Sequence, residues 1–431
     1  MSPEGHESGP ARERCAELAR AGEVLRDRPV REIAAALGRV ASRWRDPADP
    51  ARREGERSLA AHHRVPEPAI ARVLDAGFAA WTAEMLLARA DRELGSARAL
   101  DGFVDLGGAR RRALGPRLAV ALASRGVPTT PVGDLIDLLT VKSPVWLKPA
   151  TGADDLAARF ADTLREVDPG LGAAVEVATW PAAAPAAAAV LGVADLVVVT
   201  GRGETLSALR ARVPPAARLV AHGPRLSAAV VTREALADDR PGVVAALADD
   251  VAFSGQAGCL SPVVAWIEDA GGEELAEAVL AACEERWPAA PRRESGARER
   301  AAWAEWFALA GVERASGAAG PTLGDAAGGW SVQWRTKPGA PDPPVAPRIL
   351  ILAPVERAED AADLCARRRG LVAAVGVAGP PARVAPLAAA LALAGVERVA
   401  PLGRLQRPPA DWRRDGRPGL VDLVRWVDWE T

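Results

Sequence analysis

The stretch LAVALASRGVPTTPVGDLIDLLTVKSPVWLKPA, residues 118–150, decides the fold. It begins with a short apolar run, continues with a segment of helical spacing and ends with a second apolar run. We expect a strand at 118–123, a helix around Leu135–Leu139 and a strand at 145–150 that ends in a loop. Short apolar strands separated by helices predict a mostly parallel sheet that binds ligands at the carboxyl ends of its strands.

The alternation continues on the carboxyl side of this stretch, whereas the first 110 or so residues show helical spacing throughout. Further strands are predicted at 173–178, 195–201, 218–223, 348–354 and 371–379. Further helices are predicted at 153–167, 275–287 and 358–368, the first of them stopping at Asp168-Pro169-Gly170. Segments rich in Pro, Gly, Ala and Arg, at 288–301 and 313–347, are interpreted as long loops. The pattern therefore indicates an α/β protein with a helical N-terminal region.

Composition excludes several classes of protein. The formal net charge is −2 and the charges are mixed along the chain, which does not fit a protein that binds nucleic acid or an anionic membrane. Four scattered cysteines without a CxxC pair favour a reducing cytoplasm over a disulfide framework or a zinc site. The most apolar window, 177–200, is broken by prolines and Asp195, so we expect no membrane span. The polar N-terminus does not resemble a secretory signal.

His62 and His63 are adjacent, beside Arg64 and between two predicted helices. A lone histidine pair is a weak metal signature, and we interpret both as surface loop residues. No metal is expected.

Cys259, in FSGQAGCLSP (253–262), is the candidate nucleophile. It follows small, flexible residues and precedes a Ser-Pro step that can open a helix, whose unpaired backbone N–H groups would lower the pKa of the thiol. The alternative, common for intracellular cysteines, is a small buried apolar residue. Cys15, Cys283 and Cys365 fit that alternative, because each lies in an Ala- and Leu-rich helical pattern.

Lysine is rare in this chain. There are 51 arginines and only three lysines, Lys142, Lys148 and Lys337, and there is no tyrosine or asparagine. A lysine retained against this bias is a candidate for a role that a guanidinium group cannot fill.

The cysteine stretch resembles the nucleophile segment of the LuxC-type fatty acyl-CoA reductases, a branch of the aldehyde dehydrogenase superfamily. In that family a Gln-x-x-Cys-x-Ser-Pro signature surrounds the acylated cysteine. The resemblance covers roughly residues 100–430. Other stretches that agree in order and spacing are VKSPVWLKPA (141–150), REVDPGLG (165–172), DLVVVTGRGETL (195–206), HGPRLSAAVV (222–231) and the tail from 398 to 430.

The resemblance implies an aldehyde dehydrogenase-like α/β fold. We divide the chain into four parts. These are a helical N-terminal region (1–112), a Rossmann-like NADP-binding domain (113–252), a catalytic cysteine domain (253–400) and a C-terminal tail (401–431) that packs back or lies at a subunit interface.

The implied reaction is the NADPH-dependent reduction of a long-chain fatty acyl-CoA to a fatty aldehyde, as in the fatty acid reductase of bacterial luminescence. The Cys259 thiolate would attack the thioester, and the enzyme-bound thioester would accept a hydride. The backbone N–H of Cys259 is the natural donor to the oxyanion.

The resemblance also implies two elements that bind the cofactor. Lys148 and Pro149 match a Lys-Pro pair that reaches the adenosine ribose, and Thr151 replaces a glutamate that grips the ribose hydroxyls, which favours NADPH over NADH. Thr200, Gly201, Arg202 and Gly203 form a turn between strand and helix whose N–H groups could face the pyrophosphate. The alternatives are a surface lysine retained by chance and a plain strand-to-helix turn.

His222 matches the segment in which hydrolytic aldehyde dehydrogenases place a glutamate base. A histidine there could assist deprotonation of Cys259 or protonate the alkoxide, or it could simply be a hydrogen-bonded residue at a strand end. Two departures from the family pattern stand out. Arg125-Gly126-Val127-Pro128 replaces a Gly-Asn-x-Pro element, so a carboxamide that could hold the oxyanion is missing, and Val263 replaces a glutamine.

Two other functions stay open at this point. One is a catalytically weak or silent aldehyde dehydrogenase-like subunit that acts as a binding or assembly partner. The other is a reductase of another activated acyl group, delivered by a carrier protein or as an acyl phosphate. The partners expected are an acyl-CoA or acyl-protein donor, acyl-protein synthetase or transferase subunits, and further copies of this chain.

Overall fold

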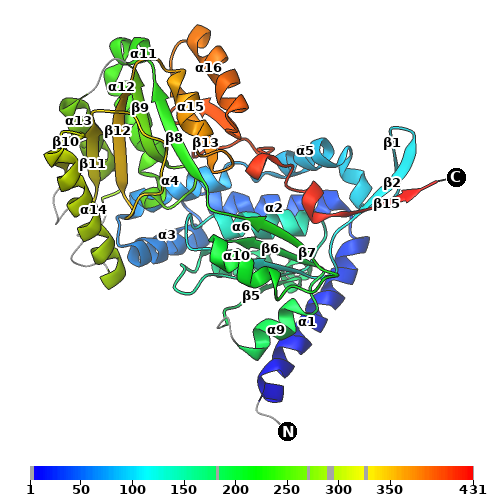
Figure 1. Cartoon of the computed structure of the whole chain (residues 1–431). Helices are drawn as coiled ribbons and strands as arrows, with labels where there is room; N and C mark the ends of the chain where they lie inside the picture. Colours follow the sequence, from blue (N-terminus) through cyan, green and yellow to red (C-terminus); the bar gives the residue numbers. More distant parts are fainter. Residues whose placement is uncertain (1–3, 181–183, 269–271, 289–295, 325–328, 431) are drawn as a thin grey trace.

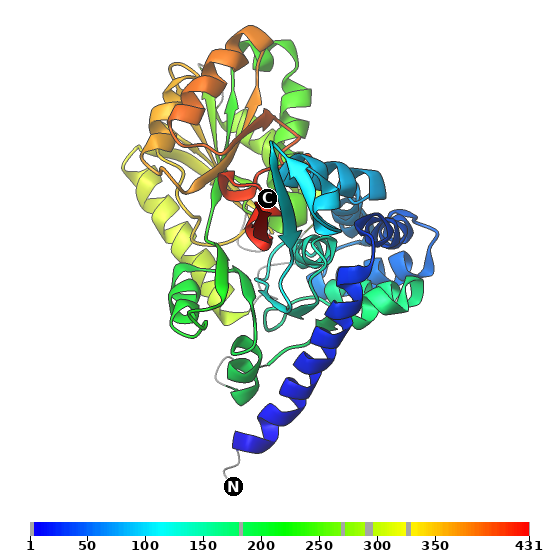
Figure 2. The ribbon, with the colours of Figure 1, turned by 90° about the vertical axis from the view of Figure 1, so that its right-hand side faces the viewer.

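The computed structural model describes residues 4–180, 184–268, 272–288, 296–324 and 329–430. The chain begins with helices, and α1 extends as a long rod along α8 and α9 (Figure 2). The first elements are α1 (Glu4–Asp27), α2 (Val30–Arg45), α3 (Pro50–His63), α4 (Glu67–Phe78), α5 (Ala83–Leu94) and the 3-10 helix η1 (Ala97–Leu100). The helical prediction is confirmed up to residue 100, but it is wrong for 104–114, which form two strands.

A five-stranded parallel sheet follows, in the order β5-β4-β3-β6-β7. Its strands are β3 (Ala119–Leu122), β4 (Val145–Lys148), β5 (Val175–Val177), β6 (Leu196–Thr200) and β7 (Arg218–His222), and its helices are α6 (Thr130–Thr140), α7 (Leu156–Val167), α8 (Pro169–Ala173), α9 (Pro185–Leu191) and α10 (Gly203–Arg210). All five predicted strands are confirmed. Because the strands are parallel, Lys148, Thr200 and His222 reach the same edge of the sheet.

The helix predicted at 153–167 begins three residues later than expected. Its stop signal, Asp168-Pro169-Gly170, does end α7, but it also opens α8. The Asp168 carboxylate accepts a hydrogen bond from the Leu171 N–H at 3.0 Å, so the residue that ends one helix caps the next.

The second sheet has seven strands in the order β10-β11-β12-β9-β8-β13-β14, parallel except for β10. Its strands are β8 (Leu226–Val231), β9 (Pro262–Glu268), β10 (Ala319–Leu323), β11 (Ser331–Arg335), β12 (Ile349–Val355), β13 (Val372–Ala378) and β14 (Arg398–Pro401). Its helices are α11 (Arg233–Asp238), α12 (Arg240–Val251), η2 (Phe253–Gln256), α13 (Glu273–Arg286), α14 (Ala297–Ala315), α15 (Asp360–Ala366) and α16 (Pro381–Leu393). The sequence-based boundary at 252/253 places β8 in the first domain, whereas hydrogen bonds join β8 to this second sheet.

The loop predictions at 288–301 and 313–347 are wrong in part. Strands β10 and β11 lie in the second segment and the two ends of α14 reach into both, while 289–295 and 325–328 lie outside the described residues. The middle of α14, where Trp303, Trp306 and Ala310 share one buried face, lies between the two segments. The physical reason for the error is tertiary, because β11 pairs with β10 and β12 in the second sheet, and local composition does not show such pairing.

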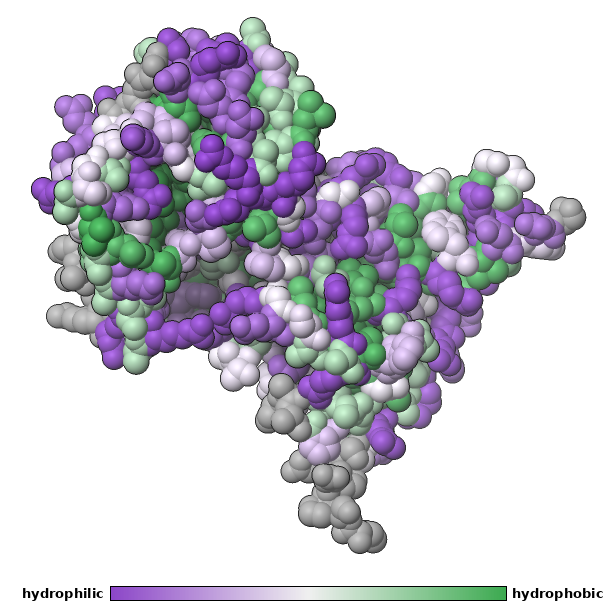
Figure 3. Space-filling model, in the orientation of Figure 1, coloured by the Kyte–Doolittle hydropathy of each residue, from purple (hydrophilic) through white to green (hydrophobic). Residues whose placement is uncertain are grey.

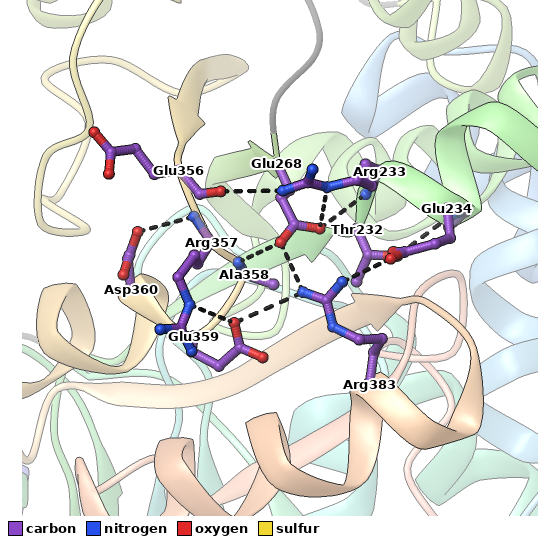
Figure 4. Close-up of polar contacts among 11 residues, drawn as sticks. Thr232, Arg233, Glu234, Glu268, Glu356, Arg357, Ala358, Glu359, Asp360 and Arg383 are labelled. Carbon is purple, nitrogen blue, oxygen red and sulfur yellow. Dashed lines mark hydrogen bonds and ion pairs between the residues drawn. The ribbon is translucent and has the colours of Figure 1, made fainter.

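Glu268 ends β9 and ties together the loops at the carboxyl edge of the second sheet (Figure 4). It is almost fully buried, and it accepts hydrogen bonds from the backbone N–H groups of Arg233 and Ala358, each at 3.1 Å, and from the Arg383 guanidinium at 2.7 Å. This carboxylate therefore joins the segments after β8, β12 and β13.

The C-terminal tail crosses back over the molecule. It runs through η4 (Arg414–Gly416) and η5 (Val421–Leu423) to β15 (Arg425–Trp429), which pairs with β2 (Ala109–Leu114) in an antiparallel sheet completed by β1 (Val104–Leu106). This three-stranded sheet projects as an arm (Figure 1). Hydrogen bonds attach the tail to the first sheet, because the Arg218 guanidinium of β7 donates to the Leu423 and Val424 carbonyls at 2.9 and 2.8 Å.

On the face seen in Figure 3, hydrophilic and hydrophobic residues are interspersed, and the surface is hollowed between the lobes of the two large sheets. Among the described residues, no helix is both long enough and apolar enough to cross a bilayer.

Candidate active site

Cys259 is exposed and lies in the loop between η2 and β9, whereas Cys15, Cys283 and Cys365 are buried. The expected helix after the Ser-Pro step is absent, because Pro262 is the first residue of β9. A proline lacks an N–H group and is tolerated at the start of a strand as well as at the start of a helix. No helix N-terminus therefore supports this thiol.

Three consecutive residues before Cys259 have left-handed backbone conformations, with φ of 49° at Ser254, 64° at Gly255 and 63° at Gln256. The Gln256 side chain holds this conformation. Its amide donates to the carbonyls of Pro262 at 2.9 Å and Ile349 at 2.8 Å, and its oxygen accepts from the Ile349 N–H at 2.9 Å. The glutamine of the signature thus fixes the cysteine loop to β9 and β12.

The cysteine loop also packs against the loop between β3 and α6. A Cβ atom on Gly258 would lie 2.9 Å from Cγ2 of Val127, and one on Gly126 would lie 3.5 Å from the Ala257 carbonyl oxygen. The segment matched to the family's Gly-Asn-x-Pro element therefore does lie beside the nucleophile. Ser227 of β8 completes the support by donating its hydroxyl to the Cys259 carbonyl at 2.7 Å.

The expected lowering of the Cys259 pKa is wrong. The thiol reaches solvent, but protein surrounds it on most sides, and this desolvation raises its pKa above the usual 9.0. The positive charges of Arg414 and Arg225 and the residue's own N–H group oppose the shift, while the negative charge of Asp415 adds to it. At neutral pH the thiol is therefore mostly protonated, and a base is needed to form the nucleophile.

His222, at the end of β7, is the candidate for that base, because it contacts Asp415, whose charge acts on the Cys259 thiol. Its Nδ1 lies 2.6 Å from the Asp415 Oδ2, and only 13% of the His222 side chain and 7% of the Asp415 side chain are exposed. Burial alone would raise the pKa of Asp415, but the His222 hydrogen bond and the charges of Arg225 and Arg414 outweigh it and hold that pKa below its usual value.

Arg414 links the tail to the first sheet. It donates to the Thr200 hydroxyl at 3.1 Å and lies 3.8 Å from Asp134 of α6, whose pKa is raised by burial against the charges of Arg414 and His222. Arg225 lies between Asp415 and Glu397, at 3.3 and 3.4 Å. Sequence reasoning missed Arg414 and Asp415, although the tail belongs to the resemblance, because nothing in their local pattern shows which strand ends they approach.

The tail residues and the first sheet enclose a cavity of about 530 Å³, open in part to solvent. His222 and Arg414 line it together with apolar and charged side chains. The apolar ones are Leu138, Val198, Val220, Trp412 and Leu423, and the charged ones are Arg89, Asp134, Asp137, Arg417 and Asp422. The cavity can therefore receive an organic group next to His222.

A second cavity, of about 910 Å³, lies at the carboxyl ends of β3 and β4. Arg125, Pro149, Gly152 and Asp154 line it, and so does Ala257 from the cysteine loop. It therefore connects the ribose-binding candidates to the nucleophile loop.

His62 and His63 also line this second cavity, but they are the last residues of α3 and not a loop. The His63 Nε2 lies 3.6 Å from the Asp154 Oδ2. In the part of the chain that the structure describes, no group of three or more potential metal ligands gathers.

Lys148 ends β4, with its Nζ 3.5 Å from the Pro149 carbonyl oxygen and 5.9 Å from the Trp180 ring. Burial lowers its pKa, and the contacts recorded for its ammonium group within the described ranges are to a carbonyl oxygen and a ring, so the group can still engage a ligand. Thr151 follows in an exposed turn that leads to Gly152. These residues fit the ribose of a nicotinamide dinucleotide, whose hydroxyl or phosphate oxygens accept hydrogen bonds from an ammonium group.

The turn at 200–203 fits a phosphate less completely. Strand β6 ends at Thr200 and α10 begins at Gly203, as expected, with Arg202 at the N-cap. However, the Thr200 hydroxyl accepts from Arg414, and the Gly201 N–H donates to the His222 carbonyl at 3.1 Å. Open space around Gly203 leaves room for a ligand at the start of α10.

Comparison with known proteins identifies one protein family. Residues 25–426 match the model of a protein family described as acyl-CoA reductase (LuxC). No curated protein sequence matches the chain.

Solved structures with a similar fold cover almost the whole chain. An NAD-dependent benzaldehyde dehydrogenase from Corynebacterium glutamicum is 13% identical, with coverage of 97% of this chain and 89% of that one and a TM-score of 0.69. An acetylating aldehyde dehydrogenase from Geobacillus thermoglucosidasius is 12% identical, with coverage of 100% and 98% and a TM-score of 0.69. An oxidoreductase from Marinobacter aquaeolei is 15% identical, with coverage of 97% and 90% and a TM-score of 0.71.

Proposed function

The chain belongs to the acyl-CoA reductase (LuxC) family and has the aldehyde dehydrogenase fold, and we propose that it reduces a long-chain fatty acyl-CoA to the aldehyde with NADPH. Family and fold support the coarser statement, acyl reduction to an aldehyde with a nicotinamide cofactor. The observation that carries the finer proposal is the exposed Cys259, in a loop that Gln256 and Ser227 hold and whose Ala257 lines the second cavity.

The residues divide the work as follows. The Cys259 sulfur attacks the thioester carbonyl, its proton passes to a base, and the CoA sulfur leaves and takes up a proton. Bound NADPH would supply the hydride that reduces the acyl-enzyme thioester. The resulting alkoxide expels the Cys259 thiolate and the aldehyde is released. Because residue 126 is a glycine, it cannot supply a carboxamide to the oxyanion. The backbone N–H of Cys259 can donate a hydrogen bond to the oxyanion instead, and Arg414 can supply positive charge.

The test is direct. Purified protein is incubated with NADPH and a panel of acyl-CoA esters from two to eighteen carbons, and the aldehyde is trapped and quantified. We expect aldehyde and oxidised NADPH in equal amounts. If no acyl-CoA ester gives aldehyde, the proposal that this chain reduces acyl-CoA is wrong.

The second candidate function is a weak or silent subunit in an assembly. The raised pKa of Cys259 and the glycine at position 126 favour it, because both make acyl transfer slower. The same assay separates the two functions. A reductase of another activated acyl group would form aldehyde only when an acyl carrier protein or an acyl phosphate replaces the CoA ester.

Cofactor preference follows from position 151. Thr151→Glu is expected to weaken NADPH binding about tenfold and to spare NADH, since a carboxylate near the 2′-phosphate adds a repulsion of about 1–2 kcal/mol at a partly solvated site. Fluorescence titration measures both affinities. Ala237→Glu, an exposed position on α11, adds the same charge elsewhere and is the control. If Thr151→Glu leaves the ratio of the two affinities unchanged, Thr151 does not set the preference.

The partner proposal concerns further copies of this chain in the cytoplasm. In the arm, β1 and β15 are edge strands, which can pair with a strand of another chain. Trp429 of β15 is 44% exposed to solvent, and the Arg110 guanidinium lies 4.0 Å from the centre of its ring. We expect a homo-oligomer by light scattering, and a monomer when residues 425–431 are deleted. A wild-type monomer at micromolar concentration would contradict this proposal.

A further inference from the structure

The C-terminal turn at 412–416 enters the active site from the far end of the chain. Asp415 and Gly416 have left-handed backbones, with φ of 56° and 70°. Aspartate and asparagine tolerate this conformation better than other side chains do. Such a conformation at a non-glycine residue is maintained only where its surroundings demand it, and it occurs often at functional sites.

The turn is anchored on both lobes. The buried Asp250 carboxylate accepts from the N–H groups of Gly403 at 2.6 Å and Leu405 at 2.9 Å. Gln406 donates to the Ser261 hydroxyl at 3.2 Å, next to the cysteine loop. On the other side Arg414 donates to Thr200. Asp415 is therefore held in place by contacts that do not involve His222.

Asp415 and His222, 193 residues apart in the chain, make a short contact of 2.6 Å between Oδ2 and Nδ1. A carboxylate accepts hydrogen bonds, so the imidazole proton is held on Nδ1 and Nε2 is left as an acceptor. The charge of Asp415 acts on the Cys259 thiol, so the imidazole that Asp415 contacts belongs to the surroundings of the nucleophile, and this tautomer leaves Nε2 free to serve as a base there.

Other titratable groups also lie around the His222–Asp415 pair. They are Arg414 from the tail, Asp134 from α6, Arg225 from the segment before β8, Glu397 from the segment before β14 and Cys259 from the nucleophile loop. Arg225 and Arg414 flank Asp415 and favour its ionised form, which the hydrogen bond to His222 requires.

We propose that Asp415 is a positioning residue that fixes the tautomer and orientation of His222, so that His222 Nε2 acts as the acid and base for acyl transfer to Cys259. This inference rests on the proposed function. In the forward step Nε2 takes the proton of the Cys259 thiol as the sulfur bonds to the acyl carbon. The CoA sulfur then leaves and receives that proton from the imidazolium. Asp415 stays ionised throughout, and no proton or electron is gained or lost in this half-reaction.

The test uses Asp415→Asn, because asparagine tolerates the same backbone conformation but no longer selects one tautomer of His222, since its carboxamide can accept from Nδ1–H or donate to a bare Nδ1. We expect formation of the acyl-enzyme, measured without NADPH by mass spectrometry after rapid quenching, to slow about 100-fold at pH 7. Alkylation of Cys259 by iodoacetamide depends only on the thiolate population. Its pH midpoint should move down, since removing the Asp415 charge favours the thiolate.

A merely structural role for Asp415 would slow acylation and alkylation together, and that outcome would overturn the inference. So would an acylation rate within threefold of the wild type. In a His222→Gln background the Asp415→Asn change should not slow acylation further, because the slowing acts through His222 and the lost Asp415 charge only favours the thiolate. Asp415→Glu should restore part of the rate. Asp411→Asn, which removes an exposed tail carboxylate paired with Arg92, is the matched control.

A measurement on the wild type keeps the inference testable even if the variant does not fold. Nitrogen-15 NMR of the histidines should show the His222 proton on Nδ1 between pH 7 and 8, and a proton on Nε2 would overturn the inference. If the wild type forms no acyl-enzyme at all, the proposed function and this inference both fail. If it does form one and Asp415→Asn is neutral, only the inference fails.

Discussion

Cys259→Ser is expected to abolish covalent labelling by acyl-CoA and to lower aldehyde formation by at least about 10³-fold. A serine hydroxyl fits the same loop, but it is far less acidic than a thiol, and desolvation at this position already disfavours the charged form of the side chain. The variant should remain folded, because the loop is held by the Gln256 side chain and by the backbone carbonyl of residue 259.

The measurement is mass spectrometry of the intact protein after incubation with an acyl-CoA, with thermal unfolding as the check on folding. Cys365→Ala removes a buried thiol from helix α15 and should label like the wild type. If Cys259→Ser and the wild type take up equal label, the nucleophile is another residue.

Glu268→Gln is expected to destabilise the fold by about 3 kcal/mol without touching the chemistry. Glu268 is the last residue of β9, whereas Cys259 precedes the first residue of that strand, so the two lie at opposite ends of β9. Glutamine has one acceptor oxygen where the carboxylate has two, so Arg383 and two backbone N–H groups lose part of their pairing. Urea unfolding at pH 7 measures the loss.

The same carboxylate gives the stability a defined dependence on pH. Burial would raise the pKa of Glu268, but the Arg383 hydrogen bond and the N–H groups of Arg233 and Ala358 outweigh it and bring the pKa to about 2, from 4.5 in the unfolded chain. The unfolded state therefore takes up the proton first as pH falls. The contribution of Glu268 is complete above pH 4.5 and declines as pH falls toward about 2.

In Glu268→Gln this part of the acid dependence should disappear, so the stabilities of variant and wild type should converge below pH 4. Glu234→Gln, at an exposed partner of Arg383, should leave the unfolding midpoint nearly unchanged. A constant difference between Glu268→Gln and the wild type from pH 7 to pH 3 would contradict the assignment.

Most strands and helices of the first sheet could be predicted from the sequence, because secondary structure depends largely on residues that are close together in the chain. The apolar runs of β3, β4, β6 and β7 predicted a parallel sheet that the structure confirms, and Lys148, Thr200 and His222 fall at its carboxyl edge as expected. Local composition failed at β10 and β11, which depend on pairing within the second sheet. It also failed at Pro262, since a Ser-Pro step permits a strand as readily as a helix.

The sequence by itself determined the parallel sheet and the family, and it supplied Cys259 as the candidate nucleophile, because each depends on short segments whose local pattern can be recognised. Only the tertiary structure decided the chemical environment of that cysteine. Its pKa is raised by protein packed around the loop, and its neighbours Asp415 and Arg414 arrive from the tail. Desolvation and charge–charge interactions depend on which groups are close in space, and separation along the chain does not show which groups those are.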